Sequence, residues 1–211
     1  MSEQNAKKKI RNAEKDCGFN SLCIYGGTFD PVHYGHLILA QFVKEELDVD
    51  KILFVPSFLP PHKDHTSYSD FQHRYNMLQL AIESNPDFLI SNIEYKRQGT
   101  SYSYLTIDEI KQQYNLDKVY FLIGGDSLVN FHQWRNPERI LDSAQVVVVG
   151  RTDSTYENVD KKIIDKVRII DSPVIEISST SIRQRIFDGK PVEYQIPEII
   201  HKYIKKHNLY K

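Results

Sequence analysis

The chain has 211 residues, of which 40% are hydrophobic and 26% are charged, and its formal net charge is -1. This length suits one domain with a good core, and the near-neutral charge excludes the broad basic field that nucleic-acid binding needs. No apolar run approaches the ~20 residues that span a bilayer, and residues 1–16 lack the apolar region of a secretory signal. Cys17 and Cys23 fit no metal or redox spacing, so we expect a cytoplasmic protein without membrane contact.

Residues 1–20 are polar and basic, and we predict a flexible extension there. Residues 21–211 alternate between strand patterns and helix patterns, and we expect them to form one domain. Strands are predicted over 22–25, 52–55, 88–93, 119–124, 145–150 and 174–177, and helices over 34–47, 70–84, 103–114, 179–188 and from Pro197 onward. This alternation predicts an α/β fold: a Rossmann-like, doubly wound parallel sheet with helices on both faces. Ligands of such sheets bind outside the carboxyl ends of the strands.

The first chemical motif is YGGTFDPVHYGHL, residues 25–37, where the first strand turns into the first helix. Gly26 and Gly27 carry no side chains, so their backbone N–H groups can approach a phosphate closely. His33 and His36 flank the start of the helix, which carries partial positive charge. The motif therefore predicts an anion site. It is neither a GxGxxG fingerprint nor a GxxxxGK[ST] loop, which disfavours a P-loop kinase or GTPase.

The second motif is EISSTSIRQRI, residues 176–186, between a predicted strand and a predicted helix. Ser178, Ser179 and Thr180 are of the residue types that cap helices, and even as caps they offer N–H and hydroxyl donors. Arg183 lies one turn further along and can point back at the same anion. This segment therefore predicts a second group of phosphate ligands.

The HxGH and ISSTxxR patterns in these motifs resemble the two signatures of the nucleotidyltransferase superfamily. The resemblance implies that His33 and His36 contact the ATP phosphates at the reacting centre. It implies that Arg183 and the serine turn hold the β- and γ-phosphates. The ATP-binding residues expected from it are Gly26, Gly27, Thr28, Phe29, Asp30, Ser178, Ser179 and Thr180.

Three further segments resemble the nicotinate-mononucleotide adenylyltransferases, and this resemblance covers nearly everything from residue 22 to 210. The segments are FVPSFLPPHK (54–63), EYKRQGTSYSYLT (94–106) and IGGDSLVNFHQWRNPERIL (123–141). The resemblance implies a catalytic role for Lys63 on its proline-stiffened loop, ATP contacts from Gly124, Asp126 and Arg151, and stacking of Trp134 on the pyridine ring. It implies that the turn from Ser101 through Tyr102 to Ser103 meets the pyridine carboxylate. Arg74 and Arg135 complete the expected substrate-binding set.

The chain departs from the family pattern at two of these positions. Ser103 stands where the family has Thr, and Arg135 stands where the family often has Tyr. Ser keeps a hydroxyl group, and a guanidinium group turned inward would favour an anionic pyridine carboxylate. His62, His65 and His73 match no common zinc spacing, and we expect them to be solvated or structural.

The implied reaction joins the AMP part of ATP to nicotinate mononucleotide and releases pyrophosphate. We expect Mg²⁺ to accompany ATP, held mainly by phosphate and water rather than by a protein metal site. Three alternatives stay open: an enzyme that prefers the nicotinamide mononucleotide, another adenylyltransferase such as one acting on pantetheine phosphate, and a nucleotide-binding regulatory module without turnover. The sequence also leaves open whether the protein forms a homo-oligomer.

Overall fold

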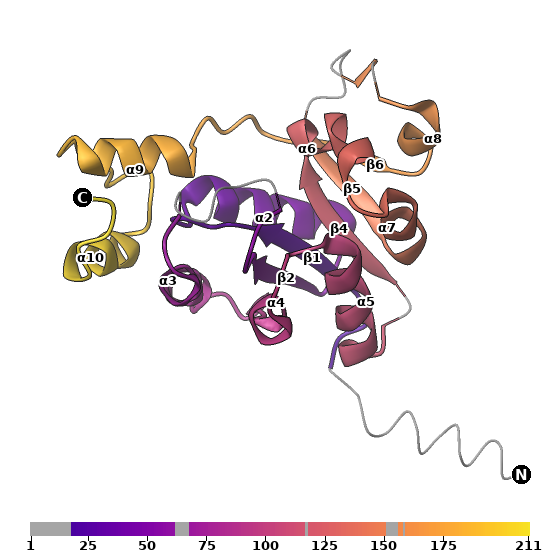
Figure 1. Ribbon diagram of the computed structural model, residues 1–211, viewed down its shortest axis with the longest axis horizontal. Helices are drawn as coiled ribbons and strands as arrows, with labels where there is room; N and C mark the ends of the chain where they lie inside the picture. The colour runs from indigo at the N-terminus through magenta and orange to yellow at the C-terminus, as the bar shows by residue number, and fades with distance from the viewer. Residues whose placement is uncertain (1–17, 62–67, 117, 151–155, 158) are drawn as a thin grey trace, which may run out of the picture.

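The computed structural model describes residues 18–61, 68–116, 118–150, 156–157 and 159–211. Its centre is one six-stranded sheet in the order β3-β2-β1-β4-β5-β6 (Figure 1). The strands are β1 (Leu22–Gly27), β2 (Lys51–Pro56), β3 (Phe88–Ile90), β4 (Val119–Gly124), β5 (Gln145–Gly150) and β6 (Arg168–Asp171). All five pairings are parallel, so the carboxyl ends of the strands lie along the same edge. The strand order reverses between β1 and β4, where sheets of this kind bind ligands.

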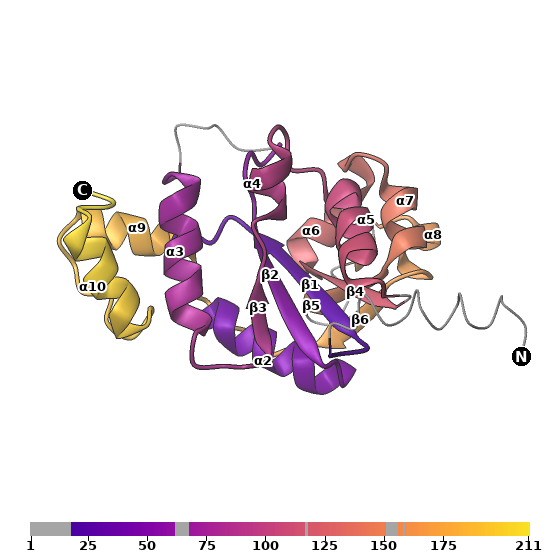
Figure 2. The ribbon, with the colours of Figure 1, turned by 90° about the horizontal axis from the view of Figure 1, so that it is seen from below.

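Helices cover both faces of this sheet, as the sequence predicts (Figure 2). The helices are α2 (Tyr34–Leu47), α3 (Phe71–Ile82), α4 (Ile93–Arg97), α5 (Ser103–Tyr114), α6 (Gly125–Val129), the 3-10 helix η1 (Phe131–Gln133), α7 (Pro137–Ser143), α8 (Lys161–Ile164), α9 (Ser179–Phe187) and α10 (Glu198–Lys206). Alternate strand residues point to opposite faces. Cys23 and Phe54 pack with α2 and α3 on one face, whereas Ile24 and Leu53 pack with α5 and α7 on the other. Because both faces are buried, the strands read as continuous apolar runs.

The predicted strand at 174–177 is wrong, because these residues form no ladder in the structure. The last strand is instead β6, which pairs with β5. Val174 is 60% exposed, while Ile175 and Ile177 line a cavity beside the sheet. Ile175 and Ile177 therefore face this cavity rather than a neighbouring layer of the sheet.

The strand predicted at 88–93 is too long, since β3 ends at Ile90 and Ile93 already begins α4. The hydroxyl of Ser91 accepts a hydrogen bond from the Ile93 N–H (3.3 Å), which supports the change from strand to helix. The helix predicted over 70–84 spans Phe71–Ile82, and Asp70 stands at its N-cap position without a capping hydrogen bond from its side chain.

The last two helices lie at one end of the molecule, beside α3 in both views (Figures 1 and 2). The hydroxyl of Tyr203 on α10 contacts His73 Nδ1 (3.1 Å) and accepts a hydrogen bond from Asn76 Nδ2 (3.1 Å). This contact gives His73 the structural role that was expected, whereas His62 and His65 lie outside the described residues. Within the part of the chain that the structure describes, no helix is both long and apolar enough to cross a membrane.

Candidate active site

Two neighbouring cavities open at the carboxyl ends of the strands. The aromatic cavity, of about 570 Å³, has Phe121 and Trp134 in its wall, and the histidine cavity, of about 530 Å³, has His33 and His36 in its wall. Tyr25, Thr28 and Gly124 line both. Tyr25 belongs to β1, Thr28 follows β1 and Gly124 ends β4, so the two cavities meet at the point where the strand order reverses.

The two histidines predicted to bind phosphate form a stacked pair at the start of α2. Their ring centroids are 3.6 Å apart and the ring planes differ by 26°. His33 Nδ1 accepts from the His36 backbone N–H (3.4 Å), and His36 Nδ1 accepts from the His33 backbone N–H (3.3 Å). A neutral imidazole whose Nδ1 is an acceptor carries its proton on Nε2. Each ring is therefore set to present an Nε2–H donor.

Burial keeps His33 neutral, because it lowers the pKa of this imidazole to about 4. The tight packing of its ring depends on Gly35. A Cβ atom at position 35 would lie 3.0 Å from His33 Nδ1 and 3.4 Å from Ile175 Cγ2. The glycine of the HxGH pattern thus makes room for the capping histidine.

Gly27 makes room for a neighbouring aromatic ring in the same way. Its Cβ position lies 2.9 Å from the ring of Phe29, which is buried and has a φ of 50°. This left-handed conformation is rare for a bulky residue, so the surrounding contacts must hold it. The loop between β1 and α2 is therefore shaped by the packing of Phe29 against Gly27.

The serine turn meets this loop directly, which brings the two predicted phosphate motifs together. Ser178 caps α9 by accepting a hydrogen bond from the Ser181 N–H (3.1 Å), and Ser179 Oγ donates to the Pro31 carbonyl (2.9 Å). Arg183 Nη1 donates to the Asp30 carbonyl (2.7 Å). Ser178, Ser179, Thr180 and Arg183 all line the histidine cavity, and so do Phe29, Asp30 and Asp126.

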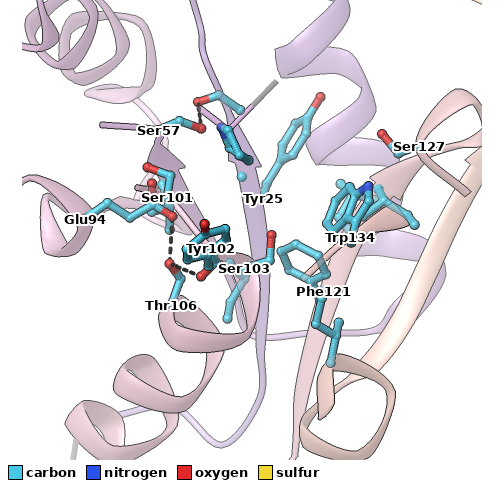
Figure 3. Close-up of a pocket in the computed structure, with 18 of the residues that line it drawn as sticks. Tyr25, Ser57, Glu94, Ser101, Tyr102, Ser103, Thr106, Phe121, Ser127 and Trp134 are labelled. Carbon is cyan, nitrogen blue, oxygen red and sulfur yellow. Dashed lines mark hydrogen bonds between the residues drawn. The ribbon is translucent and has the colours of Figure 1, made fainter. Parts of the chain in front are cut away.

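The aromatic cavity has two walls that face each other (Figure 3). Trp134 and Phe121 form one wall, with ring centroids 6.2 Å apart. Ser101, Tyr102 and Ser103 form the other, at the start of α5. Between these walls there is space for a flat ring against the indole. Arg135, expected to bind the mononucleotide, also lines this cavity, and so do Gly26 and Gly27, which were predicted on the ATP side and are not in the described lining of the histidine cavity.

Ser101 uses its hydroxyl group to hold the loop after β2. Its Oγ accepts hydrogen bonds from the backbone N–H groups of Phe58 (2.9 Å) and Leu59 (3.1 Å), and its own N–H donates to the Leu59 carbonyl (2.9 Å). The sequence leads us to expect that Ser101 contacts a substrate. In the structure its hydroxyl holds the cavity wall together, and its contact with a substrate stays a prediction.

Arg74, expected to bind substrate, is fully buried and lies outside the described lining of both cavities. Its Nε donates to the Ser69 carbonyl (2.9 Å), and its Nη1 donates to the carbonyls of Thr28 (2.9 Å) and Ser57 (2.7 Å). The guanidinium group thus ties the loops after β1 and β2 to the segment before α3. These described hydrogen bonds all go to backbone carbonyls, whereas Nη2 is buried without a hydrogen-bond partner among the described residues, so the substrate contact expected of Arg74 stays a prediction.

Glu94 and Tyr25 are among the cavity residues that were not predicted from the sequence. Glu94 is buried in the aromatic cavity, where it accepts hydrogen bonds from Thr106 Oγ1 (2.7 Å) and the Phe58 N–H (3.3 Å) and lies 3.9 Å from Arg97 Nη2. The spacing of Glu94 and Arg97 by three residues is the signal that could have indicated a helical ion pair. Tyr25 lines both cavities, and burial raises the pKa of its phenol. The strand pattern around Tyr25 does not indicate that its side chain lines a cavity.

Lys63 and Arg151 lie outside the described residues, so their predicted roles stay predictions. Among the residues that the structure describes, no group of three or more His, Cys, Asp or Glu side chains is placed to hold a metal ion. The described donors around the histidine cavity are mainly imidazole N–H, hydroxyl and guanidinium groups, which suit phosphate better than a hard cation.

Comparison with known proteins gives a consistent set of relatives. The family model described as "Cytidylyltransferase-like" matches residues 24–185. The nicotinate-nucleotide adenylyltransferase of Bacillus subtilis is 38% identical over 188 residues, which cover 89% of this chain and 97% of that protein. A protein of Lachnoclostridium phytofermentans named "Probable nicotinate-nucleotide adenylyltransferase" is 35% identical over 89% of this chain and 97% of its own length.

A solved structure has the same fold. It is the nicotinic acid mononucleotide adenylyltransferase of Plasmodium falciparum complexed with NaAD, which superposes with a TM-score of 0.74. The match covers 90% of this chain and 97% of that one at 22% sequence identity. Such a likeness establishes the parallel-sheet architecture independently of the sequence patterns.

Proposed function

Because the chain belongs to the nicotinate-nucleotide adenylyltransferase family, we propose that it transfers AMP from ATP to nicotinate mononucleotide and so forms deamido-NAD and pyrophosphate. The observation that carries this proposal is the meeting of two cavities at Tyr25, Thr28 and Gly124. One cavity is rich in donors for phosphate and the other has an aromatic wall. A reaction that joins two nucleotides needs both kinds of cavity. The two must open to each other where the attacked phosphorus lies.

In this reaction an oxygen of the mononucleotide 5′-phosphate attacks the α-phosphorus of ATP. The bond from that phosphorus to the oxygen bridging it to the β-phosphate breaks, and pyrophosphate leaves. The attacking phosphate is already ionised near neutral pH, so no residue has to remove a proton. Catalysis then rests on positioning and on stabilising the charge of the transition state. His33, which burial keeps neutral, and His36 are proposed to supply Nε2–H donors for this purpose.

We assign the leaving pyrophosphate to the start of α9. The first backbone N–H groups of a helix and its partial positive charge favour an anion. Arg183 lies against the same cavity and adds a formal charge. Lys63 and Arg151 are proposed to complete the neutralisation of the triphosphate, and Asp126 and Gly124 to bound the nucleotide on the β4 side.

We assign the pyridine ring to the face of Trp134, where stacking contributes about 1–3 kcal/mol by analogy with nucleic-acid bases. The pyridine carboxylate faces the start of α5 at Ser103, where the helix carries partial positive charge. Arg135 in the same cavity adds to this preference for an anion. The chain is therefore proposed to prefer nicotinate mononucleotide to its amide.

Mg²⁺ is proposed to enter with ATP, held by phosphate oxygens and water, and to reduce the charge that the two substrates bring together. This assignment follows from the donor set around the histidine cavity. The expected cytoplasmic location also stays a prediction, as does the possibility that the protein self-associates.

The proposal is tested by incubating the protein with ATP and Mg²⁺ together with nicotinate mononucleotide, nicotinamide mononucleotide or pantetheine phosphate in separate reactions. Mass spectrometry identifies the product and a coupled assay measures pyrophosphate. We expect deamido-NAD to form fastest. A faster reaction with either other acceptor would reassign the substrate. Binding of ATP without pyrophosphate release in any reaction would identify a regulatory module instead.

A further inference from the structure

The segment after α10 returns to the loop between β1 and α2. The Leu209 N–H donates to the Ile204 carbonyl (3.1 Å), and the Tyr210 hydroxyl then donates to Asp30 Oδ1 (2.6 Å), across 180 positions of sequence. Tyr210 has a φ of 64°, in the left-handed region that bulky residues rarely adopt. Phe29, next to Asp30, has a φ of 50°. Uncommon backbone conformations thus stand on both sides of this hydrogen bond, and tertiary contacts must hold them.

Asp30 is a buried carboxylate whose two oxygens have different partners. Its side chain is only 1% exposed, so water cannot replace a lost donor easily. Oδ1 accepts from Tyr210, and Oδ2 accepts from the Ser69 N–H (3.1 Å). Burial and the nearby Asp30 charge raise the pKa of the Tyr210 phenol, so this group stays a proton donor at physiological pH.

Arg183 lies closer to the backbone of Asp30 than to its carboxylate. Its Nη1 is 2.7 Å from the Asp30 carbonyl oxygen but 3.9 Å from Oδ2. Its guanidinium group lines the histidine cavity, and also a neighbouring hollow that Tyr210 lines. Both oxygens of the carboxylate already have donors, from Tyr210 and Ser69, while the guanidinium group donates to the backbone carbonyl.

We propose that Tyr210 is a positioning residue of the phosphate site: by satisfying Asp30, it keeps Arg183 available to the triphosphate of ATP. This inference rests on the proposed function of the histidine cavity. Without the hydroxyl group, Asp30 Oδ1 is a buried acceptor without its donor. The nearest described cation is Arg183, and an unsatisfied carboxylate attracts it away from the nucleotide.

The test compares Tyr210→Phe with the wild type in steady-state kinetics. We expect the KM for ATP to rise by about tenfold or more, which corresponds to about 1.4 kcal/mol. The KM for nicotinate mononucleotide should stay within about twofold, because Asp30, Arg183 and Tyr210 are not among the described lining of the aromatic cavity. Tyr194→Phe is the matched control, since Tyr194 is 95% exposed, and it should change neither constant.

A merely structural role of Tyr210 gives a different result. If the substitution only destabilises the fold, the melting temperature falls and less of the protein is folded, so the apparent kcat falls as well. Both KM values stay unchanged, because KM does not depend on the folded fraction. That outcome would overturn the inference. Trp134 is the only tryptophan, and its fluorescence reports mononucleotide binding by the folded protein independently of turnover.

A double-mutant cycle with Arg183→Gln tests the route through Arg183. Once Arg183 is absent, Tyr210→Phe should change the KM for ATP by less than about twofold. An equal rise in both backgrounds would show that Tyr210 acts by another route. If the wild type forms no dinucleotide, the proposed function fails instead. Equilibrium dialysis with ATP then tests the inference separately, because Tyr210→Phe must still weaken ATP binding.

Discussion

The neutral state of His33 predicts a specific pH dependence of stability. The pKa of this imidazole falls from an ordinary 6.5 to about 4 in the folded protein because the ring is buried. Between these two pH values the unfolded chain takes up a proton on His33 and the folded protein does not. Stability therefore falls as the pH falls through this window, and the contribution of His33 is fully present only above about pH 6.5.

The size of the effect follows from the two pKa values. Weighting the protonated and neutral forms in each state gives a loss of about 2 kcal/mol between pH 7 and pH 5. His33→Asn removes the titrating group and keeps a residue type that caps helices well. The wild type should therefore lose about 2 kcal/mol more than this variant over the same pH range.

Urea denaturation at pH 7, 6 and 5 measures the free energy of unfolding of both proteins. His132→Asn is a suitable control, because His132 is exposed and the control should follow the wild type at every pH. Parallel curves for the wild type and His33→Asn would refute the reasoning. They would mean that His33 takes up its proton equally well in the folded protein and that burial does not lower its pKa.

Three further substitutions test the site. Trp134→Ala removes the stacking face and should raise the KM for the mononucleotide by about 10- to 100-fold, with a much smaller effect on the KM for ATP; equal effects on both would exclude stacking. Gly35→Ala places a Cβ atom 3.0 Å from His33 Nδ1, so kcat should fall at least about tenfold while circular dichroism stays native; an unchanged kcat would mean that the histidine pair tolerates displacement. Ser101→Ala leaves the Leu59 N–H without its side-chain acceptor, so urea denaturation should show a loss of about 1–2 kcal/mol, and no loss would contradict the anchoring role.

The sequence predicts the fold best where periodicity and boundary residues agree. The helices at 34–47 and 103–114 match the structure residue for residue, because each has an apolar stripe and a clear boundary. The segment 174–177 has the alternation of a strand, but alternation cannot distinguish a sheet from the wall of a cavity. The true last strand, β6, has only four residues, of which Ile170 alone is buried, and so gives a weak pattern.

Some parts of the candidate site could likewise be predicted from the sequence, and others could not. The loop around His33 and the turn around Ser179 were predicted because glycine, histidine and serine at such positions have a local reason to meet an anion. Local sequence does not reveal that Arg74 donates to backbone carbonyls, or that the Ser101 hydroxyl accepts from the backbone of another loop. Glu94 could not be predicted as a cavity residue, since its hydrogen-bond partners Thr106 and Phe58 belong to two other segments of the chain.

The distribution of the two cavities along the chain has a consequence for protein synthesis. The described lining of the aromatic cavity comes from residues 24–140, whereas the histidine cavity also needs residues 172–183, and the Asp30 contact waits for Tyr210. A nascent chain that has emerged only through α7 already contains the described residues that line the aromatic cavity. It still lacks α9, which is proposed to hold the departing pyrophosphate. The histidine cavity and its Asp30 contact are therefore completed only by the last residues to be synthesised.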